Sequence, residues 1–288
     1  VMFKNVKIFS KLLGAFTLVA LVCAIVGLVG WNGIKRTEQA LDQVAEIRLP
    51  AIQGIGLMME MMESIKASER YLAIAAISTE DRKNEIGAFP KLWQEFQEGF
   101  DMYKKLPKTT EEEVLWEKFT VELSTWEKEH EKILDLATKV GLSDVQHLET
   151  ILVSRKLDHI KWVSALDKSI AEMTAFKAQL NPELCGLGKW LSTYTSTDQN
   201  FNGILTSFAK PHAKLHGLGE TINVLIAGNE QAQARKVFND EVLPTLQAID
   251  DIFGAGLQIV QKYNQFLNQA IAINTGSEKE ALEMAMND

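Results

Sequence analysis

Metal-ligating side chains are concentrated in one part of the chain. Three of the five histidines and one of the two cysteines fall within 58 residues, at His159, Cys185, His212 and His216. His212 and His216 are four residues apart, so on a helix their imidazoles share one face, about one turn apart, and can bind one ion. Three imidazoles and one thiolate suit a tetrahedral zinc ion. Spacing alone leaves a second interpretation open, in which these are buried structural side chains without a metal.

These residues do not predict an enzyme. A hydrolytic zinc site keeps a position open for water beside a carboxylate base, as in His-Glu-x-x-His, and the sequence contains no such motif. The glycine pairs at 186–188 and 217–219 lack the full phosphate-binding fingerprint and any preceding strand. The acidic run Glu111–Glu113 suits a helix N-terminus better than a metal site. We therefore expect no catalysis.

Composition indicates that helices position these residues. The 288 residues include only 18 Gly and 6 Pro, too little turn-forming sequence for a barrel or sandwich of many short strands. The predicted helices run from the N-terminal apolar segment to about 76, from 78 to before 107, from 110 to about 140, from 143 to about 179, through 185–190, from about 198 to 227, and from about 229 to 273.

Capping residues and prolines set these boundaries. Two pairs have the spacing of capping boxes, Thr110 with Glu113 and Ser143 with Gln146. Asn181-Pro182 breaks the chain before the short helix, and Pro211 is expected to restart the helix at the histidine pair. Pro50 and Pro244 lie inside long helices, so we expect a bend at each. The polar segment 274–288 has no evident apolar face and is expected to fray or to dock elsewhere.

A membrane-spanning helix is predicted near the N-terminus. The 23 positions 12–34 hold no charged residue, and about 20 apolar residues suffice to cross a bilayer. Lysines precede this run at positions 4, 7 and 11, so the positive-inside rule places the N-terminus in the cytoplasm. Trp31 suits the outer interface. The alternative is a cleaved signal peptide. No second span is evident, so the chain after Arg36 is expected on the opposite side.

Charge and cysteine content exclude other classes. The formal net charge is −8, and apart from the three N-terminal lysines the chain is more acidic still, which argues against nucleic-acid binding. Cys23 lies in the apolar run and Cys185 in a polar stretch far along the chain, so no disulfide is expected.

Two stretches resemble a bacterial sensor family. The opening Met2–Ile8, the apolar run and Arg48-Leu49-Pro50-Ala51-Ile52-Gln53 resemble the N-terminal sensor module of methyl-accepting chemotaxis receptors. Residues 229–252, with Glu241-Val242-Leu243-Pro244, resemble the last helix of that module. The resemblance implies an antiparallel four-helix bundle. Members of the family continue into a second span, a HAMP linker and a cytoplasmic coiled coil, and these features are not evident in this sequence.

A second resemblance concerns the candidate ligands. His159-Ile160-Lys161-Trp162, Cys185-Gly186-Leu187-Gly188-Lys189-Trp190 and Pro211-His212-Ala213-Lys214-Leu215-His216 resemble, in order, the three motifs of the chemoreceptor zinc-binding (CZB) domain, over about 143–227. In that family the matching residues bind zinc, which implies this role for all four candidates. Trp162 and Trp190 are expected to pack around the site. His130 and His147 lie outside any motif and are interpreted as surface residues.

Together these inferences predict an all-α protein with an N-terminal transmembrane helix and an antiparallel four-helix bundle into which a helical zinc-binding domain is inserted. The expected segments are 1–11 cytoplasmic, 12–34 transmembrane, 35–142 the first three bundle helices, 143–227 the CZB-like domain, 228–273 the last bundle helix and 274–288 a tail. We expect a single-pass protein of the bacterial inner membrane, mostly periplasmic, that senses a signal through helix rearrangement.

Partners and an alternative role follow from the same features. Without evident output machinery, the chain is expected to act through a partner, either a second copy or a larger membrane complex, and the sequence does not identify a small-molecule ligand. Ile55, Met58, Met59 and Met62 could line a contact between copies or belong to the bundle's own core. The alternative function is a structural or accessory zinc-binding subunit of a membrane complex.

Overall fold

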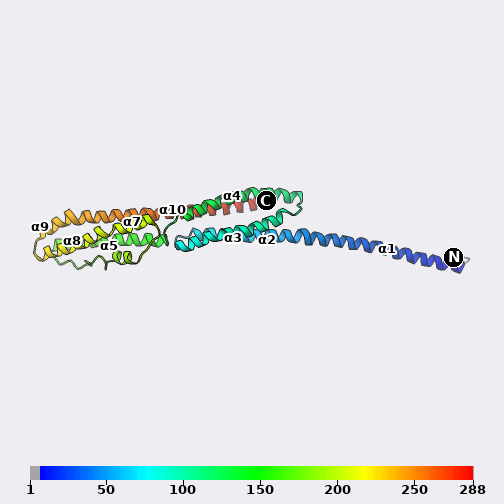
Figure 1. Ribbon diagram of the computed structural model, residues 1–288, viewed down its shortest axis with the longest axis horizontal. Coiled ribbons are helices and arrows are strands. Elements are labelled where there is room, and N and C mark those ends of the chain that lie inside the picture. The colour runs from blue at the N-terminus through cyan, green and yellow to red at the C-terminus, as the bar shows by residue number, and fades with distance from the viewer. Residues whose placement is uncertain (1–6, 288) are drawn as a thin grey trace. The chain divides into compact units, whose positions relative to one another are not determined.

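The computed structural model describes residues 7–287, with side chains described for 7–276, and all regular structure in that range is helical, as predicted. Lys4 and most of the Met2–Ile8 motif lie outside these residues. The elements in chain order are α1 Ile8–Gln43, the π-helical turn η1 Val44–Arg48, α2 Leu49–Leu72, α3 Thr79–Lys104, α4 Thr110–Thr138, α5 Val145–Glu172, α6 Gly186–Thr193, α7 Gln199–Ser207, α8 Ala209–Ala227, α9 Gln231–Val237, the π-helical turn η2 Phe238–Val242 and α10 Leu243–Asn287 (Figure 1).

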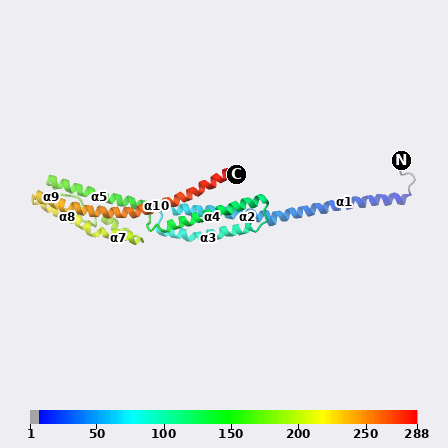
Figure 2. The same cartoon turned by 90° about the horizontal axis from the view of Figure 1, so that it is seen from above.

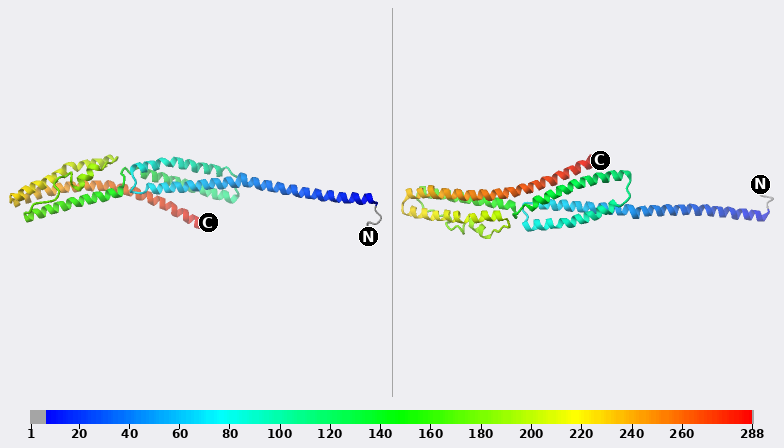
Figure 3. Two further views of the ribbon diagram at one scale, coloured as in Figure 1. Left: turned by 90° about the horizontal axis from the view of Figure 1, so that it is seen from below. Right: turned by 45° about the horizontal axis from the view of Figure 1, so that its top comes forward.

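The chain divides into two compact units, one of residues 1–63 and 91–116 and the other of residues 64–90 and 117–288. In the first unit, α1, η1 and the beginning of α2 form one continuous rod (Figure 3). Here α2 and α3 approach closely at two glycines. A Cβ atom on Gly54 would lie 2.9 Å from the Gly99 carbonyl oxygen, and one on Gly99 would lie 2.7 Å from that of Gly54. Any larger residue at either position would therefore force the helices apart.

The rod contains the candidate membrane span. Among the described residues, one helical stretch, Ile8–Leu72, is long enough and apolar enough to cross a membrane. None of its most apolar 18-residue segment is buried. This agrees with the predicted span in length and composition.

The helix α4 begins with a capping box shifted by one residue from the predicted one. The Thr109 hydroxyl accepts the Glu112 backbone N–H at 3.2 Å, and the Glu112 carboxylate accepts the Thr109 N–H at 2.7 Å. The predicted pair, Thr110 with Glu113, is therefore wrong by one position. The carboxylate of Glu112 also pairs with Arg48 at 3.1 Å.

The second unit contains the largest buried apolar cluster, which extends from Val140 to Leu267. Its long helices α5, α8 and the first part of α10 run side by side (Figure 2). Polar contacts join α5 to α10 at the edges of this core. The Lys156 ammonium lies 2.7 Å from the Asp250 carboxylate, and Asn264 donates to Glu149 at 3.0 Å. The first part of α10 is thus joined at Asp250 and at Asn264 to the helix that carries His159.

The same helix α10 continues to a second, smaller cluster. Ala270 packs with Ala73, directly after α2, and with Ile133 of α4. Beside it, the Asn274 amide donates to the buried Glu69 carboxylate at 2.9 Å, and the other Glu69 oxygen lies 2.7 Å from His130 Nδ1. Asn274, which begins the segment predicted to fray or dock, is 8% exposed. The side chains after residue 276 lie outside the described residues.

The prediction of His130 as a surface residue was wrong. His130 is 5% exposed because Glu69 of α2 pairs with it and the Phe89 ring of α3 packs edge-on against it at 4.6 Å. The corresponding prediction for His147 is confirmed, because its side chain is exposed.

Several predicted boundaries moved. The helix α5 is capped by Asp144, whose side chain accepts the His147 N–H at 3.1 Å, whereas the predicted cap, Ser143, accepts the Thr79 N–H of a neighbouring turn at 2.9 Å. The helix ends at Glu172 and not near 179, because Met173 takes a left-handed conformation with φ 49°. The predicted helix 198–227 is divided into α7 and α8 at Phe208.

Both prolines expected to bend long helices follow a π-helical turn. In η1 the Leu49 N–H bonds to the Val44 carbonyl, and in η2 the Leu243 N–H bonds to that of Phe238. Pro50 and Pro244 come directly after these leucines. A wider turn at these points accommodates the proline ring and the loss of one backbone hydrogen-bond donor.

Candidate metal centre

The structure brings the four candidate ligands together. His159 lies on α5, Cys185 directly precedes α6, and His212 and His216 lie on α8. One ligand atom from each of the four lies within 4.8 Å of each of the others. All three histidines are buried, and Cys185 is partly buried. The donors therefore come from three separate elements that only the tertiary fold can assemble.

The histidine pair follows from the start of α8. This helix begins at Ala209, two residues before Pro211, where a proline is tolerated because the first backbone N–H groups have no helical acceptor. His212 and His216 then lie one turn apart on the same face, with ring centroids 4.8 Å apart. The prediction that Pro211 accompanies a helix restart agrees with this geometry.

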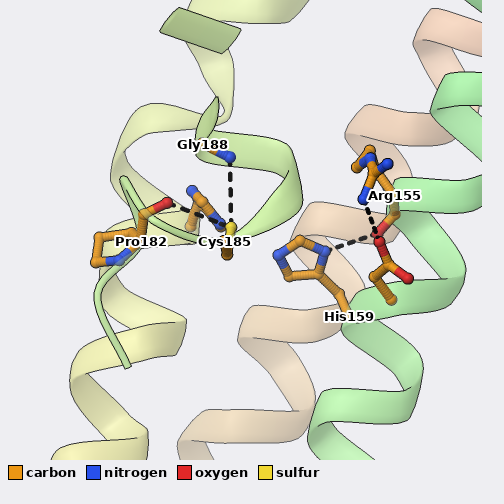
Figure 4. A network of polar contacts seen from close by, with 7 residues as sticks. Arg155, His159, Pro182, Cys185 and Gly188 are labelled. Carbon is orange, nitrogen blue, oxygen red and sulfur yellow. Dashed lines mark hydrogen bonds and ion pairs between the residues drawn. The ribbon is translucent and has the colours of Figure 1, made fainter. Parts of the chain in front are cut away.

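Cys185 is held at the N-terminus of α6. Its Sγ accepts the Gly188 backbone N–H at 3.3 Å and lies 3.3 Å from the Pro182 carbonyl oxygen (Figure 4). The same sulfur is 3.2 Å from His212 Nε2. The Cys-x-x-Gly spacing is needed because a Cβ atom on Gly188 would lie 1.9 Å from the Pro182 oxygen. Both features fix the sulfur on the side of the loop that faces α8.

Backbone carbonyls orient two of the imidazoles. His159 Nδ1 lies 2.7 Å from the Arg155 oxygen (Figure 4), and His216 Nδ1 lies 3.0 Å from the Gln179 oxygen. A carbonyl can only accept, so in both rings Nδ1 carries the proton and Nε2 keeps a lone pair. Metal-binding histidines commonly donate their other N–H in this way.

His216 Nε2 is a buried polar atom with no hydrogen-bond partner among the residues that the structure describes. Buried nitrogen atoms are nearly always satisfied, so one without a partner needs an explanation. A metal ion bound to that lone pair supplies one, and the neighbouring sulfur and imidazoles supply the remaining donors. The residues present therefore fit a bound metal.

Burial keeps the three imidazoles in the form that binds metals. Desolvation lowers the pKa of His159 and of His216, and with the nearby imidazoles it lowers the pKa of His212 to about 3. Burial therefore favours the neutral form of all three imidazoles, and for His212 down to about pH 3. A cation can bind them without first displacing protons.

Aromatic side chains enclose the donors. The Trp162 ring lies 5.2 Å from the His216 ring, and the Phe253 ring lies 6.2 Å from that of His159. The expected packing of Trp162 around the site is confirmed. Trp190 packs against the same core and stacks at 4.9 Å on Tyr194. An apolar shell of this kind limits the access of water to the donors.

Sequence reasoning missed the residues whose carbonyls orient the rings, Arg155 and Gln179. Every residue except the chain end carries such an acceptor, so no residue type marks the role. Arg155 lies one turn before His159 on the same helix, and this spacing is the only signal available. The position of Gln179 depends on the irregular segment after α5, which the sequence predicted to be helical.

Two protein-family models match separate parts of the chain. Residues 5–150, half of the chain, match the model of the four-helix-bundle sensory module for signal transduction. The chain belongs to this family. Residues 159–223 match the chemoreceptor zinc-binding domain, and this range includes all four clustered residues. No curated protein and no solved structure gives a significant match.

Proposed function

We propose that this chain is a membrane-anchored sensory module of chemoreceptor type that binds one zinc ion through His159, Cys185, His212 and His216. The observation that carries the proposal is the buried, unpartnered Nε2 of His216 in a cluster of one sulfur and three imidazoles. Zinc is the metal favoured by that donor set, and it is also the metal named by the matching family.

When bound, zinc would supply a cross-link between α5, the start of α6 and α8. Four protein donors complete a tetrahedron and leave no open position for a reacting water, so we infer a sensory or structural role and not a catalytic one. The chain's own residues hold the donors in place, with Gly188 N–H on the sulfur and two carbonyls on the imidazoles.

The helix α10 is our candidate for transmitting a change at the metal centre. Phe253 packs near His159, and farther along the same helix Ala270 and Asn274 contact α2 and α4. We infer that α10 serves as the last helix of the sensory bundle and that α5–α8 form a domain inserted before it. A signal can shift such a bundle only by binding one arrangement more tightly than another.

We also propose that residues 12–34 anchor the chain in the bacterial inner membrane with the N-terminus in the cytoplasm. The support is the exposed apolar stretch of α1 and the lysines that precede it. A membrane-impermeant thiol reagent should then label a cysteine introduced at Lys105 in intact spheroplasts. Labelling only after lysis would reverse the orientation.

The alternative is an accessory zinc-binding subunit of a membrane complex, in which zinc only stabilises the fold. A stoichiometric partner with its own activity in native purifications would favour this role. Coupling between the metal centre and the bundle, seen as a change in hydrogen exchange around Glu69 on removal of zinc, would favour the sensory one.

Metal content tests the assignment directly. The purified full chain should carry about one zinc per molecule. Cys185→Ala and His216→Ala should lose most of it, whereas the exposed His147→Ala should keep it. Equal zinc content in the three variants would refute the ligand assignment. Chelation should also lower the melting temperature, because a metal that binds only the folded chain adds its binding free energy to folding.

A further inference from the structure

One peptide carbonyl serves two donors beside the metal centre. The Gln179 oxygen accepts His216 Nδ1 at 3.0 Å and the indole N–H of Trp162 at 2.8 Å. A carbonyl oxygen has two lone pairs, so it can accept both bonds at once. The oxygen that orients a candidate ligand is thus shared with a side chain that is not itself a ligand.

Gln179 lies in a segment without helical hydrogen bonds. The chain from Met173 to α6 is irregular, and its backbone is secured at Phe176 by the Asn223 side chain, which accepts the Phe176 N–H at 2.8 Å and donates to its oxygen at 3.0 Å. The Gln179 carbonyl is three residues beyond this anchor. Its position therefore depends on the groups that bond to the carbonyl itself.

Trp162 is rigidly placed to make that bond. It lies on α5, three residues after His159, and is 8% exposed. Its ring packs edge-on against Phe176 at 4.8 Å and lies 5.2 Å from the His216 ring. The helix α8 leaves space for the indole at Gly219, where a Cβ atom would lie 2.7 Å from the Trp162 ring.

We propose that Trp162 is a positioning residue for the metal centre. Its indole N–H holds the Gln179 carbonyl where that oxygen receives the Nδ1 proton of His216, so that the lone pair of Nε2 is directed to the cluster. The proposal rests on the function proposed above and deepens it, because it assigns a residue that sets zinc affinity without touching zinc.

The first test removes the N–H and keeps a ring. Trp162→Phe in the full chain should bind zinc about 10- to 100-fold more weakly in competition with a chromophoric chelator, the usual effect of losing a group that orients a ligand, with one zinc still bound per chain. Trp116→Phe on α4, whose ring packs against Phe100 and Tyr103 and not in the shell around the donors, is the matched control and should stay within about threefold of the parent. Unchanged affinity in Trp162→Phe would overturn the proposal.

A second pair of variants keeps the indole. Gly219→Ala forces the Trp162 ring to move and should also weaken zinc binding, whereas Gly217→Ala, whose Cβ has open space on the same helix, should not. Equal affinities in these two variants would count against a positioning role for the indole. Both changes replace a helical glycine by alanine, so they share any effect on helix propensity.

The tautomer of His216 separates positioning from packing. Long-range ¹H–¹⁵N spectra of the zinc-free chain should show Nδ1–H in the parent and a mixture with Nε2–H in Trp162→Phe. A benzothienylalanine at position 162, which keeps the shape of indole without its N–H, should give the same result if the Phe variant folds poorly. An unchanged tautomer would reduce Trp162 to packing. These spectra need no zinc, so they test the proposal even if the chain fails to bind zinc.

Discussion

Gly188 shows how closely the cysteine loop is packed. The Pro182 oxygen occupies the place of its missing side chain, since a Cβ atom would lie 1.9 Å away. Gly188→Ala should therefore displace the loop that carries Cys185, lowering the free energy of unfolding by about 1–3 kcal/mol, and it should also weaken zinc binding. Denaturant unfolding and a zinc titration measure the two effects.

Gly203 of α7 provides the control, because a Cβ atom there meets nothing within 4 Å. Gly203→Ala should stabilise the chain by up to about 1 kcal/mol through helix propensity and leave zinc binding unchanged. If both alanine variants unfold at the same denaturant concentration, the close packing at Gly188 has no energetic consequence.

The buried imidazoles predict a pH dependence of the zinc-free chain. The pKa of His212 falls from its ordinary value of 6.5 to about 3 on folding, and those of His159 and His216 are also lowered. As the pH drops below about 6.5, the unfolded chain gains protons that the folded chain refuses, so stability should decline between pH 6.5 and 3. Denaturant midpoints at successive pH values measure this decline. His212→Gln should have a shallower decline than the parent, and equal slopes would contradict this explanation.

At the scale of residues, the sequence predicted which side chains form the cluster better than it predicted the surroundings of single residues. The three motifs contain the four clustered residues in chain order, because the donor atoms belong to distinctive residue types. The environment of His130 was not predictable, because its burial depends on Glu69, which is distant in the sequence and not linked to it by any motif. Long-range pairs of this kind are decided by tertiary packing.

At the scale of elements, a buried polar network joins three helices. The Glu69 carboxylate of α2 is 2% exposed and contacts both His130 of α4 and Asn274 of α10. Asn274→Leu removes one partner of a buried carboxylate and should lower the free energy of unfolding by about 1–3 kcal/mol. Zinc content should not change. The exposed Asn268→Leu on the same helix serves as the control.

A thermodynamic cycle then tests the network itself. If the contacts cooperate, the effects of Asn274→Leu and Glu69→Leu should not add, since the second change removes the buried charge that the first leaves unsatisfied. Additive effects would mean that Asn274 does not stabilise Glu69. The network would then be no more than packing at the end of α10.

Helix existence was predictable and helix ends were less so. The apolar periodicity that predicts a helix spans many residues, whereas a cap depends on one local competition. Thr109 caps α4 in place of the predicted Thr110, which is the first residue inside the helix. Asp144 caps α5 in place of the predicted Ser143, whose hydroxyl accepts the Thr79 N–H. Met173 ended α5 early in a conformation that methionine seldom adopts, and no sequence rule indicates it.

At the scale of the whole molecule, the structure divides the methionine-rich stripe of α2 into two faces. Met58 is 4% exposed and belongs to the core, whereas Met59 is 63% and Ile55 39% exposed. The two expectations for this stripe, core and contact surface, therefore apply to different residues. We propose that the exposed face, with Ile52 at its start, meets a second copy of the chain.

Disulfide cross-linking in native membranes tests that contact. Chains anchored by the same span are parallel, so a twofold interface places identical residues opposite each other. Met59→Cys and Ile55→Cys should form covalent dimers on mild oxidation, and Met58→Cys should not, all in a Cys23→Ala background. Equal yields at positions 58 and 59, or no dimer at any position, would contradict the interface.

The central claim is that one sulfur and three imidazoles hold a zinc ion. X-ray absorption at the zinc edge of the purified full chain measures this coordination directly. We expect one sulfur at about 2.3 Å and three nitrogens at about 2.0–2.1 Å, with the sulfur shell lost in Cys185→Ala. A spectrum with no sulfur shell in the parent chain, or one dominated by oxygen ligands, would contradict the account.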